Sequence, residues 1–222
     1  MNKFFLLAIL LLSSFSAFAQ SHEYSPLQGH ELKYKDWTYK NIQDGKDVNL
    51  RSFLKGKKLV MVVYFAPWCP NWRNEAPFAE KLYQKYKGHG FDVIGVSEFA
   101  TVEDTKANLA GNGTSYTVVS ESDSREAREK VLLYEYRQET GDTRKWGSPW
   151  NLFLEPAQIK KDGDVLAKNV FVVNGELIEA EVEAFVRQKL GLPAEEKKSE
   201  TAQSKTPEVC EEDPKLAPLK KP

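Results

Sequence analysis

One stretch of the chain constrains the fold more than any other. Residues 58–65 read KLVMVVYF, and every side chain after the lysine is apolar or aromatic. A strand with one face in water alternates polar and apolar residues, whereas a continuous apolar run is typical of a strand buried on both faces. We therefore expect residues 58–65 to form a central strand with further layers covering both of its faces.

The segments around this strand alternate between helical and strand patterns. Residues 71–87 carry apolar side chains on one helical stripe and residues 91–96 form a second short strand, which makes a β-α-β unit. The later segments predict a helix at 102–109, a strand at 116–119, a helix at 125–137, antiparallel strands at 151–154 and 165–173, and a helix at 179–190. The expected fold class is α/β, with a mixed β-sheet flanked by helices on both faces.

The two ends of the chain differ from the middle. Residues 4–12 are apolar, follow Lys3 and lead to small residues that end at Ala19, which is the pattern of a secretory signal. The apolar stretch is about half of the roughly 20 residues that a spanning helix needs, so we expect no transmembrane anchor after cleavage. The prediction is a signal peptide at 1–19, one domain at 20–193, a disordered polar tail at 194–222, and export to the periplasm or the extracellular space.

The charge balance and the histidine count limit the kinds of partner and cofactor that the chain is expected to bind. Cleavage after residue 19 removes Lys3 from the 31 basic side chains and leaves all 32 acidic ones. This balance favours neither a nucleic acid nor an anionic membrane as the partner. The three histidines are scattered and lack a neighbour at metal-ligand spacing, so no metal or cofactor is expected.

Cys69 lies between the central strand and the helix predicted at 71–87, in the sequence APWCPNW. A thiolate at this place faces the unpaired amide groups and the positive end of the helix dipole, which favours a nucleophilic sulfur. The alternative is an inert, packed cysteine at the end of a strand. The turn residues and tryptophans on both sides favour the reactive interpretation.

The sequence leading to Cys69 contains further signals. Residues 44–50 read DGKDVNL and residues 54–57 read LKGK, and the apolar strand and Trp68 follow. In this order they resemble the thioredoxin superfamily, and within it the exported TlpA/ResA-like (redoxin) thiol–disulfide proteins. The resemblance implies a thioredoxin-like fold over roughly residues 30–190. It also implies exchange with protein thiols or disulfides, or with a small thiol.

Two motifs beyond Cys69 support the resemblance. Glu75 and Pro77 match the Glu-x-Pro of these proteins, and the resemblance gives Glu75 a part in handling protons of the active-site thiols. The alternative is a solvated carboxylate that complements the helix dipole. Ser148 and Pro149 match the loop whose proline is cis, which shapes a groove where an extended substrate segment can pair.

Tryptophans are concentrated at the same two segments. Four of the five flank Cys69 or Pro149, namely Trp68, Trp72, Trp146 and Trp150. Large, stiff aromatic side chains anchor protein contacts well, so we expect them to line the substrate groove. The alternative is that one or two of them belong to the core.

The third residue after Cys69 departs from the family pattern, because Trp72 stands where these proteins have a second cysteine. A mixed disulfide needs a second thiolate to resolve it, so an adduct on Cys69 must wait for another thiol. Cys210 is the candidate resolving cysteine, since a flexible tail of this length can reach the domain, although the carboxylates beside it disfavour its thiolate.

Three functions therefore remain open. The leading hypothesis is an exported oxidoreductase that uses Cys69 as its single nucleophile. The second is a binding module that uses the same groove without redox chemistry. The third, a one-cysteine peroxidase of the related peroxiredoxin group, has the least support, because those enzymes place Thr or Ser three residues before the cysteine and this chain has Ala66.

Overall fold

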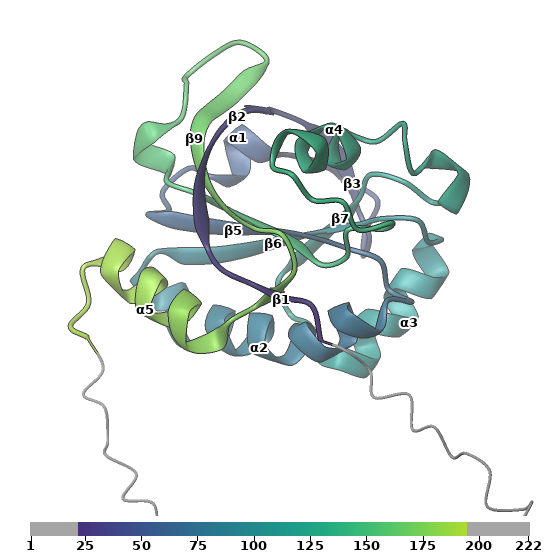
Figure 1. Cartoon of the computed structure of the whole chain (residues 1–222), viewed down its shortest axis with the longest axis horizontal. Helices are drawn as coiled ribbons and strands as arrows, with labels where there is room; N and C mark the ends of the chain where they lie inside the picture. The colour runs from purple at the N-terminus through teal and green to yellow at the C-terminus, as the bar shows by residue number, and fades with distance from the viewer. Residues whose placement is uncertain (1–21, 195–222) are drawn as a thin grey trace, which may run out of the picture.

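An eight-stranded mixed sheet forms the centre of the structure, a computed structural model that describes residues 22–194 (Figure 1). The predicted signal peptide, nearly all of the predicted tail and Cys210 lie outside the described residues. The strands are β1 (Tyr24–Ser25), β2 (Gln28–Lys35), β3 (Thr38–Asn41), β4 (Asp47–Asn49), β5 (Leu59–Phe65), β6 (Phe91–Ser97), β7 (Thr117–Ser120), β8 (Trp150–Leu154), β9 (Val165–Val173) and β10 (Glu176–Leu177). The α-helices are α1 (Leu50–Phe53), α2 (Pro70–Tyr86), α3 (Val102–Asn112), α4 (Leu132–Glu139) and α5 (Glu179–Leu190).

The order of the strands brings several chain segments to one edge of the sheet. The main sheet runs β2-β9-β8-β5-β6-β7-β3-β4, and β1 pairs with β10 beside it. The neighbours β5, β6 and β7 are parallel, while β8 and β9 continue the sheet in antiparallel pairs. Parallel strands end at the same edge, so the residues that follow β5, β6 and β7 lie together there.

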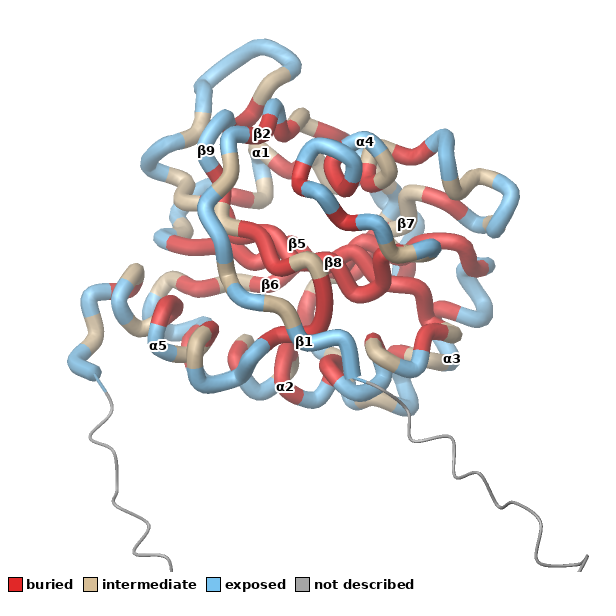
Figure 2. Tube along the Cα trace, in the orientation of Figure 1, coloured by how far each residue is buried: buried red, intermediate tan, exposed pale blue. Residues whose placement is uncertain are grey.

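The core surrounds β5, as the apolar run predicts. All seven of its residues are buried, and buried positions are concentrated in the central strands and on the helix faces turned toward them (Figure 2). The helices α2, α3 and α5 cover one face of the sheet, and α1 and α4 cover the other (Figure 1). This is the thioredoxin-like α/β arrangement that the sequence predicts, and the fold class is confirmed.

The helix that begins next to Cys69 follows from its sequence. Cys69 is the N-cap residue of α2 and Pro70 is its first helical residue, a position where the missing N–H of proline costs nothing. Four aliphatic or aromatic side chains on one stripe, Ala76, Ala79, Leu82 and Tyr86, are buried. The predicted hairpin and last helix are also present, since β8 pairs antiparallel with β9 and α5 ends at Gly191.

One predicted helix is wrong. A single helix over 125–137 does not form, because the chain makes a short 3-10 turn at Arg125–Ala127 and α4 begins only at Leu132. Val131 between them is buried in an extended conformation. The backbone N–H of Leu132 donates to Oε1 of Glu121 at 2.7 Å. These tertiary contacts outweigh the local helical pattern.

Candidate active site

Cys69 stands at the edge of the sheet where β5 ends and α2 begins. Its backbone N–H donates to the carbonyl of Ala66 at 2.9 Å, and its carbonyl accepts from the N–H of Arg73 at 3.2 Å. This tight turn holds the sulfur at the start of the helix. The residue is only 8% exposed, so a partner has to approach it through the loops around it.

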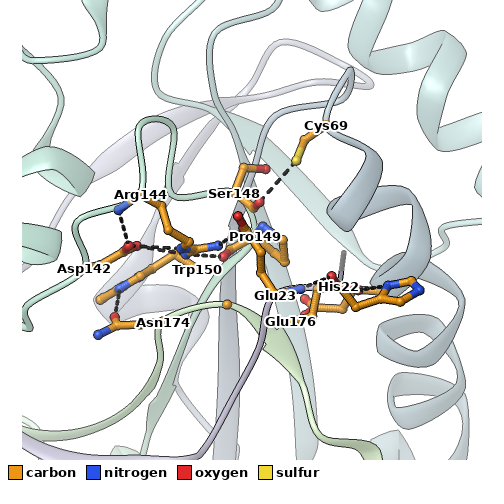
Figure 3. A network of polar contacts seen from close by, with 12 residues as sticks. His22, Glu23, Cys69, Asp142, Arg144, Ser148, Pro149, Trp150, Asn174 and Glu176 are labelled. Atoms are coloured by element: carbon orange, nitrogen blue, oxygen red, sulfur yellow. Dashed lines mark hydrogen bonds and ion pairs between the residues drawn. The ribbon is translucent and has the colours of Figure 1, made fainter. Parts of the chain in front are cut away.

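The loop that carries Pro149 closes over the cysteine (Figure 3). The thiol of Cys69 donates to the carbonyl oxygen of Ser148 at 3.1 Å, and the hydroxyl of Ser148 accepts from the backbone N–H of Ala66 at 2.8 Å. The Ser148–Pro149 peptide bond is cis, as the sequence predicts. A thiolate cannot donate this hydrogen bond, so ionisation of Cys69 removes it.

Arg144 fixes the other side of Pro149 and is not among the residues predicted from the sequence. Its guanidinium donates to the carbonyl of Pro149 at 2.9 Å and forms ion pairs with Asp142 at 2.8 Å and Glu23 at 3.1 Å (Figure 3). Burial opposes ionisation of Asp142, but hydrogen bonds and charges of Arg144 and Arg137 outweigh it and lower the pKa of Asp142. The N-terminal segment is thereby tied to the Pro149 loop.

The four tryptophans separate into two pairs. Trp72 and Trp150 are completely buried, and their indole N–H groups donate to Asn108 at 3.0 Å and to Asn174 at 2.7 Å. The expectation that these two line the groove surface is therefore wrong. Trp72 points into the core and stacks on Phe65 with ring centres 4.1 Å apart.

Trp68 and Trp146 remain half-buried beside the cysteine. Their rings meet edge to face at 5.1 Å between centres, and the indole N–H of Trp68 donates to the carbonyl of Phe99 at 3.1 Å. Their part in binding a partner stays a prediction. They are the two predicted tryptophans that retain access to solvent.

Glu75 is buried, not solvated. Its Oε2 accepts from the backbone N–H of Leu177 at 2.8 Å and from the amide of Asn151 at 3.2 Å, because this side of α2 faces β10 and β8. Burial raises the pKa of Glu75 to about 8, although the two hydrogen bonds act in the opposite direction. The interpretation as a solvated carboxylate is wrong, and the proton-handling role stays a prediction.

A second buried acid, Glu98, lies at the same edge of the sheet. It directly follows β6, and Glu121 directly follows β7. Ser122 donates to Oε2 of Glu98, while Oε1 of Glu98 and Oε2 of Glu121 have no hydrogen-bond partner among the described residues. Burial and the neighbouring Glu121 raise the pKa of Glu98 well above its ordinary value. Their position after parallel strands next to β5 is the signal in the sequence that points to this site.

The model of the AhpC/TSA family matches residues 31–145, which is more than half of the chain. The protein belongs to the AhpC/TSA family. The matched residues of this AhpC/TSA protein include Cys69, Glu75 and Glu98, whereas Pro149 lies just beyond them. No curated protein matches the chain.

Solved structures share the fold of this AhpC/TSA protein. A secreted thiol-disulfide isomerase from Corynebacterium glutamicum has a TM-score of 0.53 and 14% identity, covering 71% of this chain and 85% of its own. A thiol:disulfide interchange protein of the thioredoxin family from Chlorobium tepidum has a TM-score of 0.51 and 21% identity, with coverages of 77% and 99%. One from Bacteroides sp. has a TM-score of 0.51 and 19% identity, with coverages of 78% and 94%. At these identities the likeness establishes a thioredoxin-like fold.

Within residues 22–194, no three His, Cys, Asp or Glu side chains come together as a metal site. None of the helices in this range has the length and apolar character needed to cross a bilayer.

Proposed function

We propose that this AhpC/TSA protein is an exported thioredoxin-like thiol oxidoreductase that forms mixed disulfides with protein thiols or disulfides through Cys69. The observation that carries the proposal is the position of the sulfur. It lies at the N-cap of α2 and 3.1 Å from the carbonyl of Ser148, on the loop of the cis Pro149. The names of the structural neighbours, all thiol–disulfide proteins, agree with this assignment.

The proposed step uses one sulfur of the protein. The thiolate of Cys69 attacks one sulfur of a partner disulfide, a new S–S bond forms, and the other partner sulfur leaves as a thiolate. The proton of Cys69 goes to solvent. Because Trp72 brings no second thiol to this place, another thiol resolves the adduct. It is either an external thiol or Cys210, the candidate within the chain.

The signal peptide at 1–19 directs the domain at 20–193 and its polar tail out of the cytoplasm.

Trapping tests the proposal in the compartment to which the chain is exported. Cells that express the full chain are quenched with acid, free thiols are blocked, and proteins linked by disulfide to Cys69 are identified by mass spectrometry. We expect adducts that are absent from Cys69→Ser. If no adduct forms and Cys69 is alkylated no faster than a model peptide, the oxidoreductase proposal fails.

The second candidate is a binding module without redox turnover. The low exposure of Cys69 and its hydrogen bond to Ser148 favour this alternative. It requires that Cys69→Ser still captures the same partners without a covalent bond. Partner capture that is lost in Cys69→Ser supports the oxidoreductase instead.

A further inference from the structure

Arg125 is an exposed cation that stacks on Trp68, the residue before the candidate nucleophile Cys69. Among residues 22–194, no hydrogen bond or ion pair to its guanidinium is present, whereas Arg128 nearby pairs with Glu129. Arginine carries five N–H donors in a planar fork that matches a carboxylate. Hydrogen bonds to its own backbone and to Ser124, and to a smaller extent the charge of Arg125, lower the pKa of the neighbouring Glu126. Because no described residue accepts a hydrogen bond from the fork of Arg125, its N–H donors remain open to an anion from solution.

The ring of Trp68 holds this guanidinium in place. The guanidinium carbon of Arg125 lies 4.2 Å from the ring centre of Trp68, which immediately precedes Cys69. A guanidinium stacked on an aromatic face keeps its N–H edge available for a second ligand. Stacking also reduces the side-chain entropy that a carboxylate contact would otherwise cost.

Trp68 itself is fixed by its surroundings. Its indole N–H donates to the carbonyl of Phe99, and its ring packs on Trp146. The backbone of Phe99 has a φ of 59°, in the left-handed region that bulky residues rarely adopt, and its N–H donates to Ser122 at 3.0 Å. Strained residues of this kind are concentrated at functional sites. The arrangement presents Arg125 as a preorganised receptor.

The charges around the two tryptophans favour an anion at this position. Besides Arg125, the cationic groups of Arg128 and Lys145 lie 5.5 Å from the ring centre of Trp146, and Arg73 donates to the carbonyl of Trp68.

Acidic groups limit where the anion can bind. A shallow pocket of about 330 Å³ next to Trp68 is lined by Arg125 and by the exposed Asp104, Asp123 and Glu126. The hydroxyl of Thr101 donates to Oδ2 of Asp104 at 3.0 Å, and the backbone N–H of Asp104 donates to this hydroxyl at 3.1 Å. The site therefore fits one carboxylate at the fork of Arg125 and does not fit a long acidic segment along the pocket.

We infer that Arg125 is a specificity residue that binds a carboxylate near the reacting sulfur of the partner and so favours anionic thiols or disulfides. The inference rests on the proposed attack by Cys69. The carboxylate can belong to an acidic residue beside a partner cysteine or to a small thiol, and the chemistry at Arg125 is the same.

Thiosulfonate reagents of equal reactivity and different charge test it. Cys69 attacks the sulfenyl sulfur of the reagent, an S–S bond forms, methanesulfinate leaves with the electron pair, and the cysteine proton goes to solvent. Modification of Cys69 in the full chain is followed by peptide mass spectrometry with carboxyethyl, propyl and aminoethyl methanethiosulfonate. We expect the carboxyethyl-to-propyl rate ratio to fall about fivefold in Arg125→Gln and less in Arg125→Lys, which keeps the charge and loses the fork.

The control is an exposed, aromatic-stacked cation away from the site. Lys87 lies 5.2 Å from the ring centre of Tyr83, and Lys87→Gln should leave the ratio unchanged. An equal ratio in the wild-type protein and Arg125→Gln overturns the inference, even when Cys69 reacts fast. Peptide disulfides with aspartate or asparagine beside the cysteine distinguish the two sources of the carboxylate. A preference for aspartate that requires Arg125 identifies an acidic residue beside a partner cysteine. Absence of this preference identifies a small thiol.

A second readout does not need the reaction. The indole N–H resonance of Trp68 is followed while methylthiopropionate, or the neutral methyl propyl sulfide, is added. We expect a shift with the carboxylate that is lost in Arg125→Gln. Slow modification of Cys69 by all three reagents, together with this shift, refutes the proposed function and leaves the carboxylate site intact. Absence of the shift refutes the carboxylate site.

Discussion

Two buried acids, Glu75 and Glu98, have raised pKa values for different reasons. Glu75 is surrounded by α2, β8 and β10 and receives two hydrogen bonds that only partly offset its desolvation. Glu98 is buried against a second carboxyl group, so like charge adds to desolvation. With its pKa near 8, Glu75 can exist in both protonation states close to neutral pH and so can release or accept a proton there, whereas an ordinary exposed glutamate stays ionised.

Replacement of Glu75 by glutamine should remove a pH-dependent loss of stability. The folded-state pKa of about 8 lies above the ordinary value of 4.5. At pH values between these two, unfolding releases a proton, so stability falls as pH rises from about 4.5 to about 8. Glu75→Gln stays neutral, and its free energy of unfolding should exceed that of the wild-type protein increasingly from pH 5 to 8. The slope is at most about 1.4 kcal/mol per pH unit.

Urea unfolding at several pH values measures this difference. Glu103→Gln, at an exposed position in the first turn of α3, is the matched control and should show no such trend. A constant difference between the wild-type protein and Glu75→Gln over the whole range would show that Glu75 is ionised in the folded protein.

At the scale of the elements, the first turn of α2 decides whether the site has one thiol or two. Trp72→Cys places a thiol one helical turn after Cys69, and residues at this spacing are close enough for a disulfide. Loss of the buried indole, which stacks on Phe65, should destabilise the reduced protein by about 3–5 kcal/mol. We expect peptide mapping of the oxidised variant to show a disulfide between positions 69 and 72.

The control for that variant is Trp72→Ser, which opens the same space without a thiol. Both variants should lose similar stability when reduced. Oxidation should recover part of it only in Trp72→Cys, because the crosslink constrains the unfolded chain. Free thiols at 69 and 72 under oxidising conditions would contradict the placement of both residues on this turn.

A second element-scale prediction concerns β1, which ties the N-terminal segment to the site. A Cβ at Gly175 would lie 2.1 Å from the carbonyl oxygen of Glu23, a backbone atom that accepts from the N–H of Glu176. Gly175→Ala should therefore detach β1 from β10 and break the ion pair between Glu23 and Arg144. We expect faster hydrogen exchange of the amides in β10 and a loss of roughly 1–3 kcal/mol of stability.

Gly88→Ala is the comparison for this variant, because a Cβ at Gly88 meets nothing within 4 Å. It should leave exchange in β10 unchanged. Protection of β10 that survives Gly175→Ala would mean that β1 can shift without detaching. In that case the N-terminal segment is held mainly by its side chains.

Elements with their own strong pattern could be predicted from the sequence. The central strand is apolar throughout, and α5 carries its apolar stripe and its glycine stop at the predicted residues. The strands β2, β3 and β4 were not predicted, because they are largely polar. The strand β2 lies at one edge of the sheet, and β3 and β4 lie at the other. In β2 only Leu32 and Tyr34 are buried. Their pairing depends on distant strands, which local patterns do not report.

The site was predictable to the extent that it depends on the chain near Cys69. The cysteine at the start of α2 and the cis bond before Pro149 follow from local motifs. The burial of Trp72 and Trp150 and the free fork of Arg125 do not, because each depends on which side of an element faces a neighbour. Such contacts are set by the order of strands in the sheet.

For the whole molecule, acids with raised pKa values and acids with lowered pKa values should together produce a stability maximum near pH 5. Above it, the raised pKa values of Glu75 and Glu98 mean that unfolding releases protons, so stability falls as pH rises. Below it, the lowered pKa values of Asp142 and Glu183 mean that unfolding takes up protons, so stability falls as pH decreases.

Thermal unfolding of the full chain from pH 3 to 9 measures this profile, with the midpoint expected to fall on both sides of its maximum. The double variant Glu75→Gln, Glu98→Gln keeps both side chains neutral, so it should flatten the profile above pH 5 and leave the acid side unchanged. Asp142→Asn removes the ion pair with Arg144, so it should lower the midpoint at neutral pH. It should also make the midpoint fall less steeply below pH 5, because Asp142 no longer takes up a proton on unfolding. A wild-type midpoint that rises from pH 5 to 8 would show that Glu75 and Glu98 are ionised in the folded protein, and it would remove both from any proton transfer at Cys69.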